Sequence, residues 1–266
     1  MNTSPPGVAR FAATEARRDI IVRMGDTATA SGAGASDSNP PPRPRTIAVD
    51  GSAASGKSTV GRRLAAALGY RFLDTGVMYR AVTLAALQRG LDPHDAKALT
   101  RLAQTIDIGV SLPGPGSNEP SFITVDGQDV TAHLRDPAVE DAVSLVSRVP
   151  GVRKALVQKQ REIAGRHSIV MAGRDIGTVV LADADLKIYL DAGLEERARR
   201  RYRDFAASRP DVTHEIVLED IRRRDQMDSE REVSPLRAAD DAIVLQTDAL
   251  SLEAVMEKVF ALLEAN

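Results

Sequence analysis

The sequence of 266 residues contains no cysteine, and only 3% of its residues are aromatic. The absence of cysteine excludes disulfides, thiolate zinc sites and cysteine nucleophiles. The scarcity of aromatic side chains disfavours nucleic-acid binding by base stacking. The chain also lacks a large excess of either charge, since its formal net charge is −2. No overall electric field therefore attracts it to nucleic acid or to an anionic membrane.

Long apolar runs are also missing. No run reaches the roughly 18 residues of a membrane span, and the N-terminus lacks the apolar core of a secretory signal. Hydrophobic residues still make up 43% of the chain, enough for a substantial core in one or two domains. We therefore expect a soluble cytoplasmic protein that contacts neither membrane nor nucleic acid.

The strongest chemical signal is the segment Ile47–Thr59, IAVDGSAASGKST. It matches the phosphate loop G-x-x-x-x-G-K-[ST], with Gly51, Gly56, Lys57 and Ser58 at the defined positions. Glycines let several backbone N–H groups converge on one anion, and a following helix adds its positive dipole end. Lys57 is placed to reach nucleotide phosphates and Ser58 to bind Mg²⁺. A strand-like run precedes the loop and an amphipathic pattern follows, which favours phosphate binding over a turn that binds nothing.

The organisation along the chain predicts an α/β fold. Residues 1–44 are rich in Gly, Ala, Ser and Pro and are expected to form a disordered leader. From Arg45 strands and helices alternate, which is typical of a parallel sheet wrapped by helices. The expected strands are Thr46–Val49, Tyr70–Leu73, 167–173, 186–192 and 242–247; the expected helices are Lys57–Leu68, Val77–Arg89, 138–163, 194–208 and 251–265.

One segment breaks this alternation. Between Ile106 and Val130 two β-like runs, IDIGVSL and SFITVDGQDV, flank PGPGSNEP. We expect a small antiparallel insertion here.

Two arginine-rich segments follow the predicted strand 186–192. The first holds Arg197, Arg199, Arg200, Arg201 and Arg203; the second holds Arg222, Arg223, Arg224 and Arg231. In the second, acidic residues alternate with the arginines, which weakens attraction for a polyanion but preserves contacts to a single phosphate. This composition favours a closing lid over a nucleic-acid surface, because phosphoryl transfer needs charge neutralisation and exclusion of water.

Two further motifs follow predicted strands. FLDTGVMYRA carries Asp74, Thr75, Tyr79 and Arg80, and AGRDIGTVV carries the pair Arg174–Asp175. The carboxyl ends of parallel strands are where ligands bind in such sheets. The alternatives are that Asp74 or Thr75 only caps a helix and that Arg174–Asp175 is a structural ion pair at a tight turn.

Taken in this order, with KIYLDA, ERARRR, RRRDQMDSERE and SPL, these motifs resemble bacterial cytidylate kinases from about Arg45 to the C-terminus. The resemblance implies a three-layer P-loop kinase fold with a central parallel sheet, an inserted acceptor-binding domain and a mobile lid. The implied boundaries are a core of 45–76, 167–205 and 236–266, an acceptor-binding region of 77–166 and a lid of 206–235. It also implies phosphorylation of CMP and dCMP by ATP with Mg²⁺, in a monomer.

The same resemblance implies roles for individual residues. The donor phosphates would lie in the loop formed by Gly51, Ser52, Ala53, Ala54, Ser55, Gly56, Lys57, Ser58 and Thr59, with Arg197 and Arg201 serving the donor or the transferred phosphate. The acceptor phosphate would be held by Arg80 and Arg174, and the sugar by Arg224 and Asp228. Tyr79 would contact the acceptor, and the base pocket or its rim would be formed by Thr75, Ser144, Arg153, Asp175 and Arg231.

Three positions depart from the family pattern. Ala172 stands where an acidic residue is usual, leaving Asp50 and Asp175 as candidate substitutes near magnesium. Met227 replaces a basic lid residue, and Thr75 replaces a serine while keeping the hydroxyl.

The remaining alternatives are a uridylate, adenylate or shikimate kinase, a GTP-binding switch and a nucleic-acid-binding module. No Asn-Lys-x-Asp guanine motif supports the switch.

Overall fold

The computed structural model describes residues 44–117, 119–205, 209 and 211–265. The predicted leader therefore lies outside the described residues except for Pro44, and so do four positions of the predicted lid. Within the described part of the chain, no helix is both long and apolar enough to span a membrane.

A sheet of five parallel strands forms the centre of the molecule, in the order β2-β6-β1-β7-β8. Its strands are β1 (Thr46–Gly51), β2 (Arg71–Asp74), β6 (Ile169–Gly173), β7 (Leu186–Asp191) and β8 (Ile243–Gln246). Because the strands run in one direction, their carboxyl ends meet at a single edge. Asp50 lies beside Gly173 in register there, and Asp74 beside Ala172.

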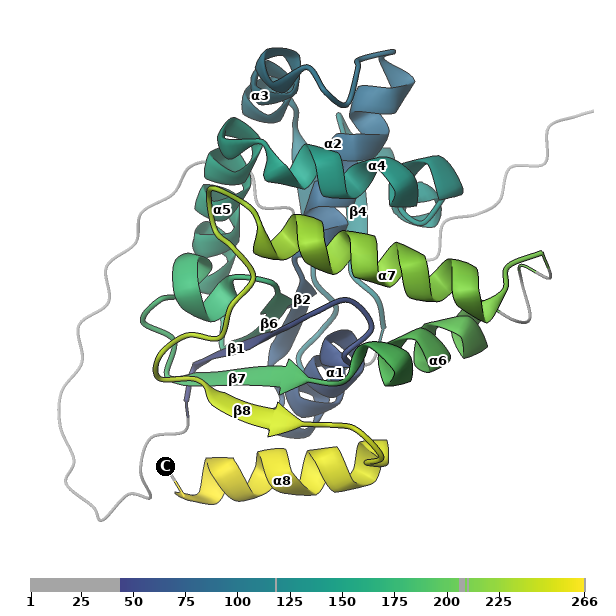
Figure 1. Ribbon diagram of the computed structural model, residues 1–266. Helices are drawn as coiled ribbons and strands as arrows, with labels where there is room; N and C mark the ends of the chain where they lie inside the picture. Colours follow the sequence, from purple (N-terminus) through teal and green to yellow (C-terminus); the bar gives the residue numbers. More distant parts are fainter. Residues whose placement is uncertain (1–43, 118, 206–208, 210, 266) are drawn as a thin grey trace, which may run out of the picture.

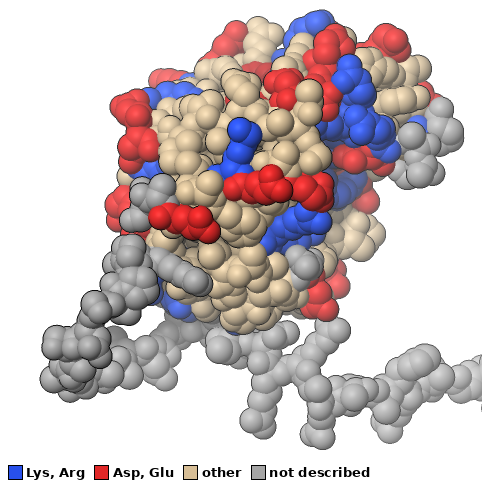
Figure 2. Space-filling model, turned by 90° about the horizontal axis from the view of Figure 1, so that it is seen from below, with Lys and Arg blue, Asp and Glu red and all other residues tan. Residues whose placement is uncertain are grey.

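Helices cover both faces of this sheet, which confirms the predicted three-layer architecture (Figure 1). One face packs against α1 (Lys57–Leu68) and α8 (Leu252–Ala265) through residues such as Ile47, Val170 and Val259. The other face packs against α2 (Gly76–Gln88) and α5 (Pro150–Ala164). Figure 2 shows the molecule from below, and acidic and basic side chains lie interspersed on that face rather than in a continuous basic surface.

The predicted antiparallel insertion is confirmed. It consists of β3 (Ile108–Ser111), β4 (Phe122–Val125) and β5 (Gln128–Asp129). Asp126 and Gly127 join β4 to β5 with φ values of 49° and 80°, as a tight hairpin turn requires. Sequence patterns did not predict α3 (Ala96–Thr105), which is capped by the Asp95 carboxylate, or the short turns η1 (Thr131–His133) and η2 (Ile176–Val180).

The helical pattern predicted over 138–163 is confirmed, and it is divided between two helices. The structure has two helices, α4 (Pro137–Arg148) and α5, separated at Val149. Pro150 restricts the preceding residue to extended conformations, and Val149 accordingly has φ −68° and ψ 117°.

Two helices, α6 (Leu194–Phe205) and α7 (His214–Ser229), pack against each other through Ala198, Val217 and Ile221. α7 lies within the predicted lid, 206–235, whereas α6 ends before it and lies in the predicted core segment 167–205. α7 also packs against α4, and Figure 1 shows it crossing the molecule between the sheet and α4. It thus covers the space above the carboxyl edge of the sheet.

Candidate active site

A cavity of about 860 Å³ opens at the carboxyl edge of the central sheet. It lies between the loop after β1, the helices α2 and α4, the turn after β6, and α6 with α7. The predicted site residues that it brings together are Ala53, Ala54, Gly56, Lys57, Ser58, Thr59, Thr75, Tyr79, Arg80, Ser144, Arg153, Arg174, Asp175, Arg201, Arg224, Asp228 and Arg231. Four predicted residues do not line it: Gly51, Ser52, Ser55 and Arg197.

The loop between β1 and α1 has the geometry of a phosphate cradle. Gly51 has φ 148°, and a Cβ there would lie 2.3 Å from the Leu190 carbonyl oxygen, so only glycine fits. Lys57 folds back over the loop and donates a 2.6 Å hydrogen bond to the Ser52 carbonyl. Within the described chain, the buried hydroxyls of Ser52 and Ser55 meet no hydrogen-bond partner. The loop thus holds polar atoms that an anion can satisfy.

The Lys57 ammonium lies in an unfavourable environment for its charge. Burial, followed by the nearby Arg174 guanidinium, lowers the pKa of Lys57 well below its ordinary value. An anion in the loop would restore the charged form, because an opposite charge at short range favours ionisation. The loop is therefore electrostatically prepared for a phosphate.

Two side chains with oxygen atoms that could bind a metal ion, Ser58 and Asp74, meet near the start of α1. The Ser58 hydroxyl donates a 2.7 Å hydrogen bond to Asp74, whose other carboxylate oxygen accepts from the Gly76 N–H at 3.0 Å. Burial raises the pKa of Asp74, but Arg80, the Ser58 hydroxyl, Lys57 and the Gly76 N–H together hold it below its ordinary value, so the carboxylate is ionised. A hydroxyl and a carboxylate are ligands of the type that Mg²⁺ prefers.

Asp50 and Asp175, the two carboxylates that are candidate substitutes for the acidic residue usual at position 172, are engaged by other groups of the protein and do not hydrogen-bond to Ser58 within the described part of the chain. Asp50 accepts the N–H groups of Ile176 and Gly177 at 2.8 and 2.7 Å, and burial raises its pKa to about 6. Asp175 pairs with Arg153. Asp74, which lies beside Ala172 in the sheet, is the carboxylate that reaches Ser58.

A closed ring of polar contacts forms the inner wall of the cavity. Asp175 binds Arg153, which donates to the Ser147 carbonyl at 3.2 Å. The Ser147 hydroxyl accepts from Arg231 at 3.0 Å, and Arg231 binds Asp228. Asp228 accepts from Arg174 at 2.8 Å, and Arg174 precedes Asp175 in the chain. The ring therefore joins β6, α5, α4 and α7.

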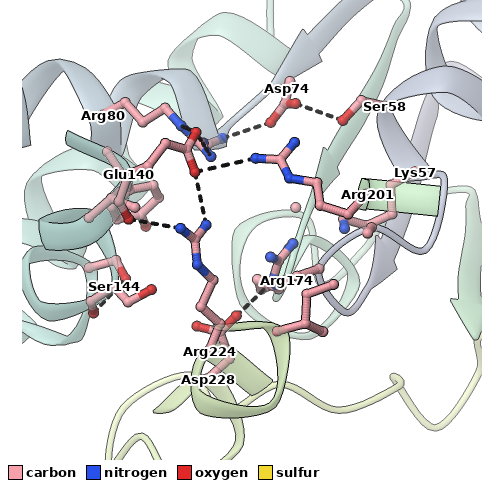
Figure 3. A pocket seen from close by; sticks show the side chains of 18 of the residues that line it. Lys57, Ser58, Asp74, Arg80, Glu140, Ser144, Arg174, Arg201, Arg224 and Asp228 are labelled. Carbon is pink, nitrogen blue, oxygen red and sulfur yellow. Dashed lines mark hydrogen bonds and ion pairs between the residues drawn. The ribbon is translucent and has the colours of Figure 1, made fainter. Parts of the chain in front are cut away.

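Opposite the ring, Glu140 of α4 lies at the centre of three arginines (Figure 3). Its carboxylate contacts Arg80, Arg224 and Arg201 at 3.0, 2.9 and 3.5 Å. Burial raises the pKa of Glu140, but the three guanidinium groups outweigh burial and hold it at about 2. Sequence reasoning missed Glu140. Its spacing with Ser144 and Ser147 marks a polar stripe on an otherwise apolar helix, which was the available signal.

Arg197 lies behind the phosphate loop rather than in the cavity. Its guanidinium donates to the carbonyls of Ala192 and Ala53 at 2.8 and 3.2 Å and forms a 2.6 Å ion pair with Asp225 of α7. These contacts join the loop, α6 and α7. Arg201, four residues later on the same helix, does line the cavity.

A phosphate loop that follows the central strand of a parallel sheet, facing an arginine-lined cavity beneath the helices α6 and α7, places this chain among the P-loop kinases of small molecules. The family model described as cytidylate kinase matches residues 47–265, which is most of the chain. The chain therefore belongs to the cytidylate kinase family.

Individual relatives agree with this assignment. The chain is 50% identical to a cytidylate kinase of Mycolicibacterium paratuberculosis over 212 residues, covering 79% of this chain and 91% of that protein. It is 45% identical to one of Caldanaerobacter subterraneus subsp. tengcongensis over 220 residues, covering 83% and 95%. For one of Geobacillus kaustophilus the identity is 47% over 214 residues, covering 80% and 94%.

Proposed function

We propose that this protein transfers the γ-phosphoryl group of ATP directly to the phosphate of CMP or dCMP, giving CDP or dCDP. The observation that carries the proposal is a single cavity with the phosphate loop at one end, a buried Arg153–Asp175 pair at the other, and arginines between them. We also propose that the protein acts as a monomer in the cytoplasm.

At the donor end, the loop from Gly51 to Thr59 and the Lys57 ammonium hold the phosphates of ATP. Ser58 and Asp74 would hold Mg²⁺ together with phosphate oxygens. The ion would supply neutralisation of the negative charge on the donor phosphates. Arg201 lies where it can contact the transferred group.

At the acceptor end, Arg80 and Arg174 bind the acceptor phosphate, and Arg224 and Asp228 contact the sugar. The base pocket uses Asp175 to accept from the exocyclic amino group of cytosine and Arg153 to donate to its ring acceptors. Thr75, Ser144, Tyr79 and Arg231 complete its walls. Uracil carries an oxygen where cytosine carries the amino group, so Asp175 disfavours it.

The reaction needs no covalent intermediate and no strong general base, because the attacking oxygen belongs to an anionic phosphate. Catalysis then consists of alignment and neutralisation of charge, which the arginines and Lys57 supply. α7, in the proposed lid, excludes water together with α6, because water would otherwise hydrolyse ATP.

The experiment is to measure ADP formation by purified protein with ATP, Mg²⁺ and each nucleoside monophosphate in turn. We expect activity dominated by CMP and dCMP. Preference for UMP or AMP would contradict the assignment of the base pocket, and absence of ADP with every acceptor would contradict kinase activity. Light scattering of the same sample gives its molar mass and so tests whether the protein is a monomer.

A further inference from the structure

We propose that Glu140 sets the affinity for the acceptor nucleotide by acting as an internal counter-ion for the arginines that bind its phosphate and sugar. This inference rests on the proposed function, because that function assigns Arg80 and Arg224 to the acceptor.

The contacts of Glu140 occupy the N–H groups that an acceptor needs. Arg80 directs two nitrogens, Nε and Nη2, to one carboxylate oxygen at 3.1 and 3.0 Å. Arg224 donates from Nη1 to the other oxygen at 2.9 Å and from Nη2 to the Glu140 carbonyl at 3.0 Å. The third nitrogen of Arg224 faces Asp220 at 2.9 Å. Two nitrogens of Arg224 thus donate hydrogen bonds to Glu140, and the third lies in an ion pair with Asp220.

The charge balance around Glu140 explains why a carboxylate is useful there. Guanidinium groups from α2, α6 and α7 converge on one anion whose side chain is 7% exposed. Arg135 lines the same cavity. Without the carboxylate, like charges would repel one another at short range in a poorly solvated space. Glu140 therefore stabilises the protein while the acceptor site holds no phosphate.

The same carboxylate opposes binding of the acceptor. A phosphate monoester brings a charge of about −1.5 to −2 at neutral pH to the same arginines. A negative side chain at this distance repels it and competes for the same donors. Removal of the charge should therefore strengthen acceptor binding while it destabilises the free protein. A purely structural role for Glu140 predicts only the loss of stability.

The test is Glu140→Gln, which keeps the shape of the side chain and removes its charge. Calorimetric titration with CMP should give a Kd at least about fivefold lower than that of the wild type. The Tm of the free variant should fall, and the rise in Tm produced by saturating CMP should be larger than in the wild type. Cytidine, which keeps the sugar and lacks the phosphate, should show a much smaller difference in Kd between the two proteins than CMP does.

The matched control is Asp241→Asn. It removes the partner of Lys187 on β7, an ion pair of 2.7 Å outside the cavity, and should leave the Kd for CMP unchanged. An unchanged or higher Kd in Glu140→Gln overturns the proposal, and a higher Kd would make Glu140 a positioning residue instead. If Glu140→Gln does not fold, the test uses Glu140→Asp, whose shorter side chain moves the carboxylate away from the arginines by one methylene. The Kd for CMP should then fall about twofold. An unchanged Kd overturns the proposal.

These outcomes are separable from failure of the proposed function. If the wild type binds another nucleoside monophosphate in place of CMP, the assignment of the base is wrong. The titration of Glu140→Gln with that nucleotide still tests Glu140, because the phosphate is common to all of them.

Discussion

Arg174 and Asp228 lie side by side in the inner wall of the cavity and are joined by a 2.8 Å hydrogen bond from Nε to the carboxylate. Arg174 directly follows β6, and Asp228 is in the last turn of α7. The other carboxylate oxygen of Asp228 binds Arg231. A single buried carboxylate thus ties the lid helix to the central sheet.

We expect Asp228→Asn to destabilise the protein by about 3 kcal/mol, because it leaves two cations without their buried partner. The free energy of unfolding measured with urea checks this. Asp240→Asn is the control, since Asp240 is 98% exposed in its pair with Arg237 and should contribute close to zero. Equal changes in the free energy of unfolding for the two substitutions would contradict the inference that Asp228 stabilises the packing of α7 against the central sheet.

Lys57→Ala should abolish most of the activity and leave the fold intact. The ammonium contacts only the Ser52 carbonyl among the hydrogen bonds of the described residues, and burial already disfavours its charge. We expect kcat to fall by at least about 100-fold and Tm to change little. Steady-state kinetics and thermal melting check both expectations, and full turnover in the variant would exclude the proposed donor site.

Asp74→Asn should raise the Mg²⁺ concentration that gives half-maximal rate. The substitution replaces a carboxylate beside the Ser58 hydroxyl by a neutral amide, which is a weaker ligand for a hard cation. We expect a rise of about tenfold or more. Titration of Mg²⁺ at fixed ATP checks it, together with Mg²⁺-dependent nucleotide binding measured without turnover. An unchanged requirement for Mg²⁺ would remove Asp74 from the metal site.

Asp175→Asn should narrow the preference for CMP over UMP. The amide offers a donor to the oxygen that uracil carries where cytosine has its amino group. We expect the ratio of kcat/KM for CMP to that for UMP to fall by at least about tenfold. The same kinetics with Thr75→Ser, which keeps the hydroxyl, should preserve the ratio.

Stability at low pH should depend on Glu140. Its pKa is lowered from 4.5 to about 2 in the folded protein, so its contribution is fully present above pH 4.5 and is lost as the pH falls toward 2. At about 1.4 kcal/mol for each pKa unit, the contribution is about 3 kcal/mol. The free energy of unfolding of wild type minus that of Glu140→Gln, measured at a series of pH values, should shrink across this window. A difference independent of pH would contradict the ion cluster.

The sequence allowed prediction of the features that depend on neighbouring residues. The phosphate loop, its flanking strand and helix, and the hairpin insertion follow from contiguous patterns, and all are present in the structure. The arrangement of charges could not be predicted in this way, since Glu140 meets Arg224 across 84 positions of sequence. For the same reason, the arginine cluster of α6 did not indicate which arginine faces which side. Arg197 lies behind the phosphate loop, and Arg201 lines the cavity.

The closed ring of polar contacts has a consequence for fidelity. Because it closes through the peptide bond between Arg174 and Asp175, the ring links the proposed base pocket to α7 without a gap. We expect a base that does not satisfy Asp175 and Arg153 to disturb Arg231 and Asp228 as well. The free energy of a poor fit would then be spread over two helices and the sheet edge rather than confined to the base pocket.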